Sequence, residues 1–362
     1  MKKKVLIIAE AGVNHNGSLD RAIELINIAA QSGADIVKFQ TFKSEAVISK
    51  FASKADYQKK TTGQNETQLE MVKKLELTDE DHEVLLKHCA SKSIQFMSTP
   101  FDLGSVDFLA KTLKVSKLKI SSGEISNAPL LLKAAESGKP IILSTGMCTL
   151  ADVECALGVL AFGYLGGSQQ PSPAHFQQAY SSAKGQEILR EKVSLLHCTT
   201  EYPSPYEDVN LHAMKTMEQA FGLPVGLSDH TPGISVPIAA VAMGALIIEK
   251  HFTSDKNLPG PDHKASLSPE ELNAMVTSIR QVEVALGSPL KLPAASELKN
   301  KDIARKSIVA SRDIKKGEKF TLENLTTKRP GYGLPPIMLW DMLGKQASRD
   351  YLQDEVLIEN AG

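Results

Sequence analysis

The sequence has few of the features that mark secreted or membrane-spanning proteins. It holds four cysteines, Cys89, Cys148, Cys155 and Cys198, with no C-x-x-C spacing, which argues against a disulfide scaffold and indicates reduced thiols. No apolar run reaches the roughly 18 residues that a membrane-crossing helix needs. The apolar start Val5–Ala9 meets Glu10 too soon for a signal-peptide core. We therefore expect a cytoplasmic protein that does not enter a membrane.

The sequence also lacks an excess of charge of either sign. Its 41 basic and 42 acidic residues leave a formal net charge of −1. No bulk field attracts nucleic acid or an anionic bilayer, so we expect neither as a partner. Hydrophobic residues make up 42% and charged residues 23% of the chain, which is enough for a large globular core. Any anion that binds must be recognised by a local site.

A repeating pattern of strand and helix signals fills the first four fifths of the chain. Eight short, β-branched apolar runs alternate with helical patterns up to about residue 286. These runs are 5–12, 36–42, 95–101, 118–124, 140–146, 193–199, 225–231 and 246–252. Eight parallel strands favour a (β/α)8 TIM barrel, which we place at 1–287. An open dinucleotide-binding sheet is disfavoured, because no G-x-G-x-x-G turn follows the first run.

The remaining residues suggest a linker and a second, smaller domain. The last barrel helix begins with the capping sequence Ser268-Pro269-Glu270-Glu271 and ends at Gly287. Residues 288–304 contain two prolines and no sustained periodicity, which predicts a linker. Residues 305–362 contain short strand and turn signals, with one short helix near Pro336–Met342. We also predict an inserted loop or helical excursion at 163–185.

Polar side chains follow the apolar body of every predicted strand, and in a parallel barrel these carboxyl ends meet at one mouth. The candidates are Glu10, Lys38, Gln40, Thr99, Lys119, Ser122, Glu124, Ser144, Thr200, Tyr202, Ser228, His230, Glu249 and His251. Two lysines, Lys38 and Lys119, together with several hydroxyl groups suit a small phosphate-bearing anion. The alternative is that the lysines only pair Glu10, Glu124 or Glu249.

Two histidines end adjacent predicted strands. His230 and His251 without a third protein ligand would make a poor structural zinc site. They suit an exchangeable Mn²⁺ or Mg²⁺ whose shell is completed by water and substrate oxygens, although an ordinary hydrogen-bonded role is the alternative. Glu10 and Glu124 suit general acid or base catalysis, or orientation of a sugar hydroxyl. Asp262, just after the eighth strand, could accept hydrogen bonds from a polyol.

Ordered motifs along the chain carry a family resemblance. They are AEAGVNHNG (9–17), DIVKFQTFK (35–43), FMSTPFD (96–102), LKISSGE (118–124), ILSTGM (142–147), LLHCTTEYPSPYEDVNL (195–211), GLSDHTPG (226–233), IEKHFT (248–253), PGPDHKASL (259–267) and KRPGYG (328–333). Together they resemble the bacterial sialic acid (N-acetylneuraminate) synthases, including the closely similar N,N'-diacetyllegionaminate synthases. The resemblance implies a catalytic barrel, a C-terminal antifreeze-like (SAF) domain at 305–362, and a domain-swapped homodimer.

The resemblance also implies a role for each matching residue. Phosphoenolpyruvate would bind Lys119, Ser122, Ser144, Thr99 and Ser228, with Lys38 and Gln40 completing the pocket. The acceptor sugar would contact Tyr202, Glu124 and Asp262, Arg329 would reach its N-acetyl group, and His230 with His251 would hold Mn²⁺. Thr200 stands where some relatives carry asparagine. Glu10 or Glu124 would position the attacking water.

The implied activity is condensation of phosphoenolpyruvate with an N-acetylated amino sugar and water, with phosphate leaving by C–O cleavage. N-acetylmannosamine, which gives N-acetylneuraminate, is the first expectation. The alternative acceptor is 2,4-diacetamido-2,4,6-trideoxymannose, which gives N,N'-diacetyllegionaminate. A second enzyme class is a Schiff-base aldolase that acts through Lys119. A non-enzymatic alternative is a sugar- or ice-binding protein that uses its C-terminal domain.

Overall fold

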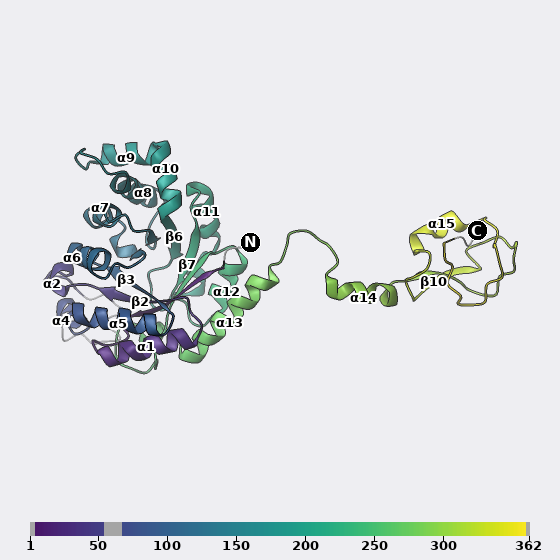
Figure 1. Cartoon of the computed structure of the whole chain (residues 1–362), viewed down its shortest axis with the longest axis horizontal. Coiled ribbons are helices and arrows are strands. Elements are labelled where there is room, and N and C mark those ends of the chain that lie inside the picture. The colour runs from purple at the N-terminus through teal and green to yellow at the C-terminus, as the bar shows by residue number, and fades with distance from the viewer. Residues whose placement is uncertain (1–3, 54–66, 360–362) are drawn as a thin grey trace. The chain divides into compact units, whose positions relative to one another are not determined.

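The computed structural model describes residues 4–53 and 67–359. The chain divides into two compact units, Met1–Gly287 and Ser288–Gly362 (Figure 1). The first unit contains the long sheet and most of the helices, and the second contains a short two-stranded sheet. Each unit is described by itself below.

Eight parallel strands form the sheet of the first unit. They are β1 (Leu6–Gly12), β2 (Ile36–Thr41), β3 (Gln95–Pro100), β4 (Leu118–Ile120), β5 (Ile141–Ser144), β6 (Val193–Cys198), β7 (Val225–Asp229) and β8 (Ile247–His251). Their order is β3-β2-β1-β8-β7-β6-β5-β4, and the two end strands β3 and β4 contact each other. The sheet therefore curls into a barrel, which confirms the TIM-barrel prediction.

Helices surround this barrel and connect its strands (Figure 1). The longer ones are α1 (Leu19–Gln31), α5 (Asp79–Ser91), α7 (Ala128–Glu136), α8 (Leu150–Leu165), α11 (His212–Phe221), α12 (Ser235–Ala242) and α13 (Pro269–Ala285), and the short ones are α2 (Ser44–Val47), α4 (Gln68–Lys73) and α6 (Leu103–Asp107). The predicted cap of α13 is present, since Ser268 and Glu271 form a reciprocal capping box. Within the described ranges, no helix is long and apolar enough to span a bilayer.

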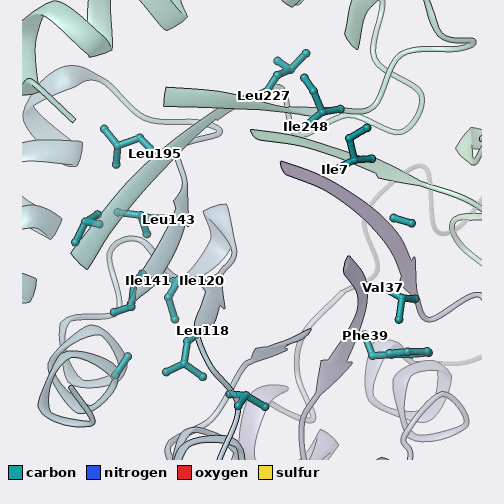
Figure 2. Close-up of a cluster of buried hydrophobic side chains, with 14 of the residues drawn as sticks. Ile7, Val37, Phe39, Leu118, Ile120, Ile141, Leu143, Leu195, Leu227 and Ile248 are labelled. Carbon is teal, nitrogen blue, oxygen red and sulfur yellow. The ribbon is translucent and has the colours of Figure 1, made fainter. Parts of the chain in front are cut away.

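Alternating side chains along the strands build two separate apolar layers. One set packs outward against helices such as α1 and α7, and Figure 2 shows part of it on β1, β2 and β4–β8. The opposite set fills the barrel interior with Ile8, Ile36, Met97, Ile142, Leu196 and Ile247. The inward position of β7 is Gly226, where a Cβ atom would lie 2.2 Å from the carbonyl oxygen of Ile247. Only glycine fits this close approach of β7 to β8.

On every strand, the next inward position towards the carboxyl end holds a side chain that differs in chemistry from the apolar layer. Two residues beyond the apolar layer stand Glu10, Lys38, Thr99, Ser144, Cys198, Ser228 and Glu249, and Lys119 has the same direction on β4. All are buried. The strand period of two thus puts a charged and hydroxyl-rich layer directly above an apolar plug.

The fourth strand and the predicted insertion can be compared with the sequence in detail. The fourth strand ends at Ile120, and Ser122–Glu124 form a 3₁₀ turn in place of a longer strand. The segment at 163–185, predicted as an inserted loop or helical excursion, is mostly helical. It contains the end of α8, α9 (Pro173–Ser181) and the start of α10 (Ala183–Lys192). Both α9 and α10 contact α8, which explains how the insertion is held.

The second unit is a small β-rich fold with its own core. Strands β9 (Ser307–Ala310) and β10 (Leu325–Lys328) pair antiparallel, and α15 (Leu339–Met342) lies in the predicted short helix. Its core includes Ile308, Phe320 and Tyr351. Residues 288–304, predicted as a linker, contain the helix α14 (Ala295–Ala304). All of α14 is exposed, so it carries no apolar face from which periodicity could reveal it.

Candidate active site

A cavity of about 450 Å³ opens among the strand ends of the barrel. Its lining includes every barrel residue proposed from the sequence: Glu10, Lys38, Gln40, Thr99, Lys119, Ser122, Glu124, Ser144, Thr200, Tyr202, Ser228, His230, His251 and Asp262. These residues come from positions up to 252 apart in the chain, because parallel strands bring their carboxyl ends to one mouth.

Two lysines and two glutamates form a buried ionic network at the bottom of the cavity. Lys38 Nζ lies 2.8 Å from Glu10 Oε2 and 3.6 Å from Glu249 Oε2. Lys119 Nζ lies 3.5 Å from Glu249 Oε1. Each of the four side chains is at most 6% exposed. Because removal of one partner would leave a buried charge uncompensated, the four groups must be treated as a unit.

Burial and mutual attraction shift the pKa values of these groups in different directions. Burial opposes the charge on Lys119 and holds its pKa below the ordinary value. Burial also opposes charge on Lys38 and Glu249, but the opposite charges around them outweigh it, raising the pKa of Lys38 and lowering that of Glu249. Burial dominates at Glu10, whose pKa is raised. Of the two carboxylates in the network, Glu10 is therefore the one that takes up a proton more readily.

Hydroxyl groups surround the lysines. Lys38 Nζ donates to Thr99 Oγ1 at 3.1 Å, and Ser228 Oγ donates to Glu249 Oε1 at 3.0 Å. Ser122 Oγ accepts from the backbone N–H of Gly146 at 2.9 Å. Ser144 Oγ is buried, and no atom of the described residues lies within hydrogen-bond distance of it. A buried, unpaired hydroxyl beside two lysines is suited to a polar ligand in the cavity.

The two histidines lie close enough to share an ion. Their ring centroids are 5.7 Å apart, and Tyr202 packs on the His230 ring at 4.2 Å. With metal–nitrogen bonds of about 2.1 Å, two rings on one ion have centroids at most about 6.5 Å apart. Burial lowers the pKa of both histidines, which keeps the rings neutral as metal ligands must be.

The hydrogen bonds of these rings leave suitable nitrogen atoms open. His230 Nδ1 donates to the carbonyl oxygen of Thr199 at 2.6 Å, so its Nε2 keeps a lone pair. His251 Nδ1 is buried and has no hydrogen-bond partner among the described residues. These residues also contain no cluster of three or more His, Cys, Asp or Glu side chains that could hold a metal. The pair therefore fits an ion that takes its other ligands from water and substrate.

The outer part of the cavity holds the predicted sugar ligands. Asp262 is buried, and burial raises its pKa to about 6. Glu124, on the 3₁₀ turn after β4, accepts a hydrogen bond from Asn127 Nδ2 at 2.7 Å. Thr200 lies close to Gly146, where a Cβ atom would stand 2.4 Å from Thr200 Oγ1. Gln40 and Tyr202 are partly exposed in the same lining.

Arg329 differs from the other predicted residues because it belongs to the second unit. Its side chain is exposed there, and its Nε donates to the carbonyl oxygen of Ala304 at 3.0 Å. The guanidinium thus keeps its other N–H donors for a further partner. Its role towards a sugar remains a prediction from the family resemblance.

Sequence reasoning did not assign a site role to Glu249. It appeared only in the list of polar strand ends and as a possible partner for the lysines, yet it contacts both of them and Ser228. The strand period could have placed it, since Glu249 stands two residues before His251 and must share its inward direction. Lys250 has the opposite direction and forms a buried ion pair with Asp229 outside this network.

Comparison with protein families gives two matches along the chain. Residues 25–291 match the NeuB family, and residues 305–358 match the SAF domain. An N,N'-diacetyllegionaminic acid synthase of Campylobacter jejuni is 52% identical over 99% of this chain and 100% of its own. One of Legionella pneumophila is 48% identical over 94% of this chain and 90% of its own.

A solved structure supports the same fold. An N-acetylneuraminic acid (sialic acid) synthetase from Leptospira borgpetersenii, crystallised with citrate, has a TM-score of 0.65 and 34% sequence identity. The match covers 82% of this chain and 90% of the other. This chain thus shares its fold with a solved protein that is similar in sequence.

The raised pKa of Asp262 predicts a specific pH dependence of stability. Its folded-state pKa of about 6 lies above the unfolded value near 3.9, so its contribution is present below about pH 4 and is lost as the pH rises through 6. Asp262→Asn removes this loss. Relative to wild type, the variant should gain about 2 kcal/mol of unfolding free energy between pH 4.5 and 7, measured by urea denaturation without metal or substrate.

The matched control is Glu24→Gln, which also replaces a carboxyl group by an amide, at an exposed position on α1. The difference in unfolding free energy between this control and wild type should be the same at both ends of the pH range. If Asp262→Asn and wild type kept a constant stability difference across this range, the buried carboxyl of Asp262 would not titrate as its surroundings indicate.

Proposed function

The chain belongs to the NeuB family, and on that premise we propose that it condenses phosphoenolpyruvate with a 2,4-diacetamido-2,4,6-trideoxy sugar to give N,N'-diacetyllegionaminate and phosphate. The observation that carries this proposal is the 52% identity to a synthase of that product along both full chains. The neutral histidine pair and the buried lysines support the same chemistry. We place the reaction in the cytoplasm, where phosphoenolpyruvate is made.

The comparisons with relatives change which acceptor sugar is expected first. N-acetylmannosamine was the first expectation, and the diacetamido sugar was the alternative. The two diacetyllegionaminic acid synthases are 52% and 48% identical to this chain, against 34% for the sialic acid synthetase. The alternative therefore becomes the main proposal, and N-acetylneuraminate synthesis becomes the second.

The ionic network would act as the phosphoenolpyruvate site. Lys38 and Lys119 supply positive charge for phosphate and carboxylate, and hydroxyl donors such as Ser144 complete the hydrogen bonds. With both glutamates ionised, the two positive and two negative charges of the network cancel. The network would then neither attract nor repel the anion strongly. Protonation of Glu10, which its raised pKa favours, leaves a net positive charge that suits the incoming anion.

His230 and His251 would hold a divalent ion, with Mn²⁺ preferred and Mg²⁺ the alternative. When bound, such an ion supplies Lewis-acid polarisation of the acceptor aldehyde. Thr199 keeps His230 in the tautomer that such binding needs. Asp262, Glu124 and Tyr202 would orient the hydroxyl and amide groups of the sugar from the outer part of the cavity.

The reaction follows from these positions. C3 of phosphoenolpyruvate attacks the aldehyde carbon as the C2=C3 and C=O π bonds break, and water then adds at the cationic C2. One C–C and one C–O bond form in place of the two π bonds. Glu10 or Glu124 would position this water, and Glu124 would take its proton when Glu10 is already protonated. A proton must also reach the former aldehyde oxygen, which becomes a hydroxyl group. The tetrahedral intermediate loses phosphate by cleavage of its C–O bond, while Lys38 and Lys119 stabilise the charge on the leaving group.

A Schiff-base aldolase remains the rival enzyme class, and one observation favours it. Burial lowers the pKa of Lys119, as the amine of a Schiff-base lysine requires. The ion pair with Glu249 opposes this role, because it stabilises the charged ammonium form. The metal-assisted synthase also accounts for the histidine pair, which an imine mechanism leaves without a function.

We further propose a domain-swapped homodimer, in which Arg329 of one subunit serves the barrel of its partner. The supporting observations are the SAF domain match and the exposed guanidinium of Arg329. The predicted contact is a bidentate or single hydrogen bond from the guanidinium to the acetamido oxygen of the sugar.

The acceptor assignment predicts the outcome of a phosphate-release assay. With phosphoenolpyruvate and Mn²⁺, the diacetamido-trideoxy sugar should give a kcat/KM at least about 10-fold above that of N-acetylmannosamine, because the two sugars differ in substituents that the site must recognise. Mass spectrometry identifies the nine-carbon product. A preference for N-acetylmannosamine would favour the second proposal.

Two controls in this assay separate the synthase from the aldolase. Chelation, or His251→Ala, should stop phosphate release, whereas His212→Ala at an exposed position on α11 should not. Treatment with pyruvate and borohydride should leave Lys119 unmodified. Covalent trapping of Lys119 with activity that survives chelation would establish the aldolase alternative.

The proposed dimer predicts complementation between two defective subunits. Lys119→Met damages the barrel and Arg329→Ala damages the SAF domain, so each homodimer should turn over poorly at low acceptor concentration. In an exchanged equimolar mixture, half of the dimers are mixed and each has one intact site, so about a quarter of wild-type activity should return.

The matched control replaces Arg329→Ala with Arg312→Ala, a change at another exposed arginine of the same unit. That variant should be active by itself. If subunit exchange is verified by two affinity tags and no activity returns, Arg329 does not serve a partner's barrel.

A further inference from the structure

The cavity has an apolar side that the phosphoenolpyruvate site does not use. This apolar wall consists of Val13, Phe42, Val47, Ile48, Ala52, Met71, Val72, Leu75 and Phe101. Among the described lining residues of α2, α4 and their flanks, only Ser49 and Gln68 add polar side chains. The wall therefore offers few hydrogen bonds to whatever lies against it.

The wall is a packed surface of its own. Val13, Phe42 and Leu75 form a buried cluster separate from the main barrel core, with Val72 and Phe101 against it. The rings of Phe42 and Phe101 meet edge to face, with centroids 6.3 Å apart. Such a cluster keeps its shape when a ligand binds, and ligand sites typically combine an apolar lining of this kind with a few polar groups.

Phosphoenolpyruvate does not match this surface. Its three carbons carry a carboxylate, a phosphate group and the reacting methylene, and the ionic network supplies partners for the charged groups. The remaining occupant of the cavity is the acceptor sugar. This step rests on the proposed function, because it takes a sugar as the second substrate.

The topology sets the distance between the wall and the histidine pair. Val13 follows β1, the neighbour of β8 that carries His251, and Phe42 follows β2, one strand further. Strands lie about 4.8 Å apart, so the part of the wall that follows β1 and β2 lies about 5 to about 10 Å around the mouth from His251. Five C–C bonds of about 1.5 Å span about 6 Å from C1 to C6 of an open-chain sugar. A sugar whose aldehyde lies at the histidine pair can thus place its C6 end on the wall.

We propose that the apolar wall selects the 6-deoxy acceptor by receiving its C6 methyl group. A methyl group makes no hydrogen bonds in water and therefore loses none on the wall. The C6 hydroxyl of N-acetylmannosamine would lose its hydrogen bonds to water and find few hydrogen-bond partners there. The wall is therefore a specificity determinant for the sugar, distinct in chemistry from the groups that bind phosphate. It discriminates at the end of the sugar opposite to the reacting carbon.

Substitution of valine by threonine on the wall tests this proposal with little change in volume. Val47 is 36% exposed at the end of α2, and Val72 is partly buried on α4, so neither added hydroxyl should prevent folding. In the double variant Val47→Thr/Val72→Thr, the ratio of kcat/KM for the diacetamido-trideoxy sugar to that for N-acetylmannosamine should fall about 10-fold. The KM for phosphoenolpyruvate should change less than about twofold, because the wall does not touch its charged groups.

The matched control is Val284→Thr on α13, where the side chain is 81% exposed. It should keep the wild-type ratio. Val47→Thr alone provides a milder variant, whose fold circular dichroism can verify. An unchanged ratio in folded wall variants of an enzyme that does use the diacetamido sugar overturns the wall proposal and leaves the proposed function intact. Wild-type enzyme that releases no phosphate with either sugar contradicts the proposed function itself.

Discussion

The buried network of Glu10, Lys38, Glu249 and Lys119 is the interaction on which the rest of the site depends. Charges of this kind are tolerated inside a barrel only when they compensate each other, and loss of one partner typically costs about 3–5 kcal/mol. The barrel bears the desolvation cost of these buried charges at its carboxyl end, directly above an apolar layer that holds the strands together. A site that gives up stability to hold two lysines in place is prepared for an anion.

The other parts of the cavity are arranged around this network. The histidine pair is on the adjoining strands β7 and β8 and keeps two nitrogen atoms free for an ion. The apolar wall begins at the end of β1, the neighbour of β8 on the side away from β7. This division into a proposed anion site, a proposed metal site and an apolar wall suits a condensation between a small charged molecule and a longer neutral one.

Much of this could be predicted from the sequence, because one periodicity controls it. Alternation along parallel strands fixed the direction of Glu10, Lys38 and His251 once the strands were located. The same rule places Glu249 on the side of Glu10 and His251, and it places Lys250 on the opposite side of β8. The helix α14 escaped prediction because a fully exposed helix leaves no apolar pattern.

Features that depend on loops and chain assembly were harder to predict. The apolar wall combines strand ends with α2 and α4, whose short helical segments carry no long periodicity. The acceptor could not be chosen from the motifs, since related synthases share them, and the degree of identity to relatives decided the order. Arg329 entered only through resemblance, because an exposed arginine has no local signal of function.

The most direct measurement is calorimetric titration of phosphoenolpyruvate into wild-type enzyme and the folded Lys119→Met variant. The account predicts binding about 100-fold weaker in the variant, since a charged hydrogen-bond donor to the anion is lost. Lys87→Met, whose side chain is 79% exposed on α5, should bind like wild type. Equal affinity in Lys119→Met and wild type would contradict the claim that the buried network is the anion site.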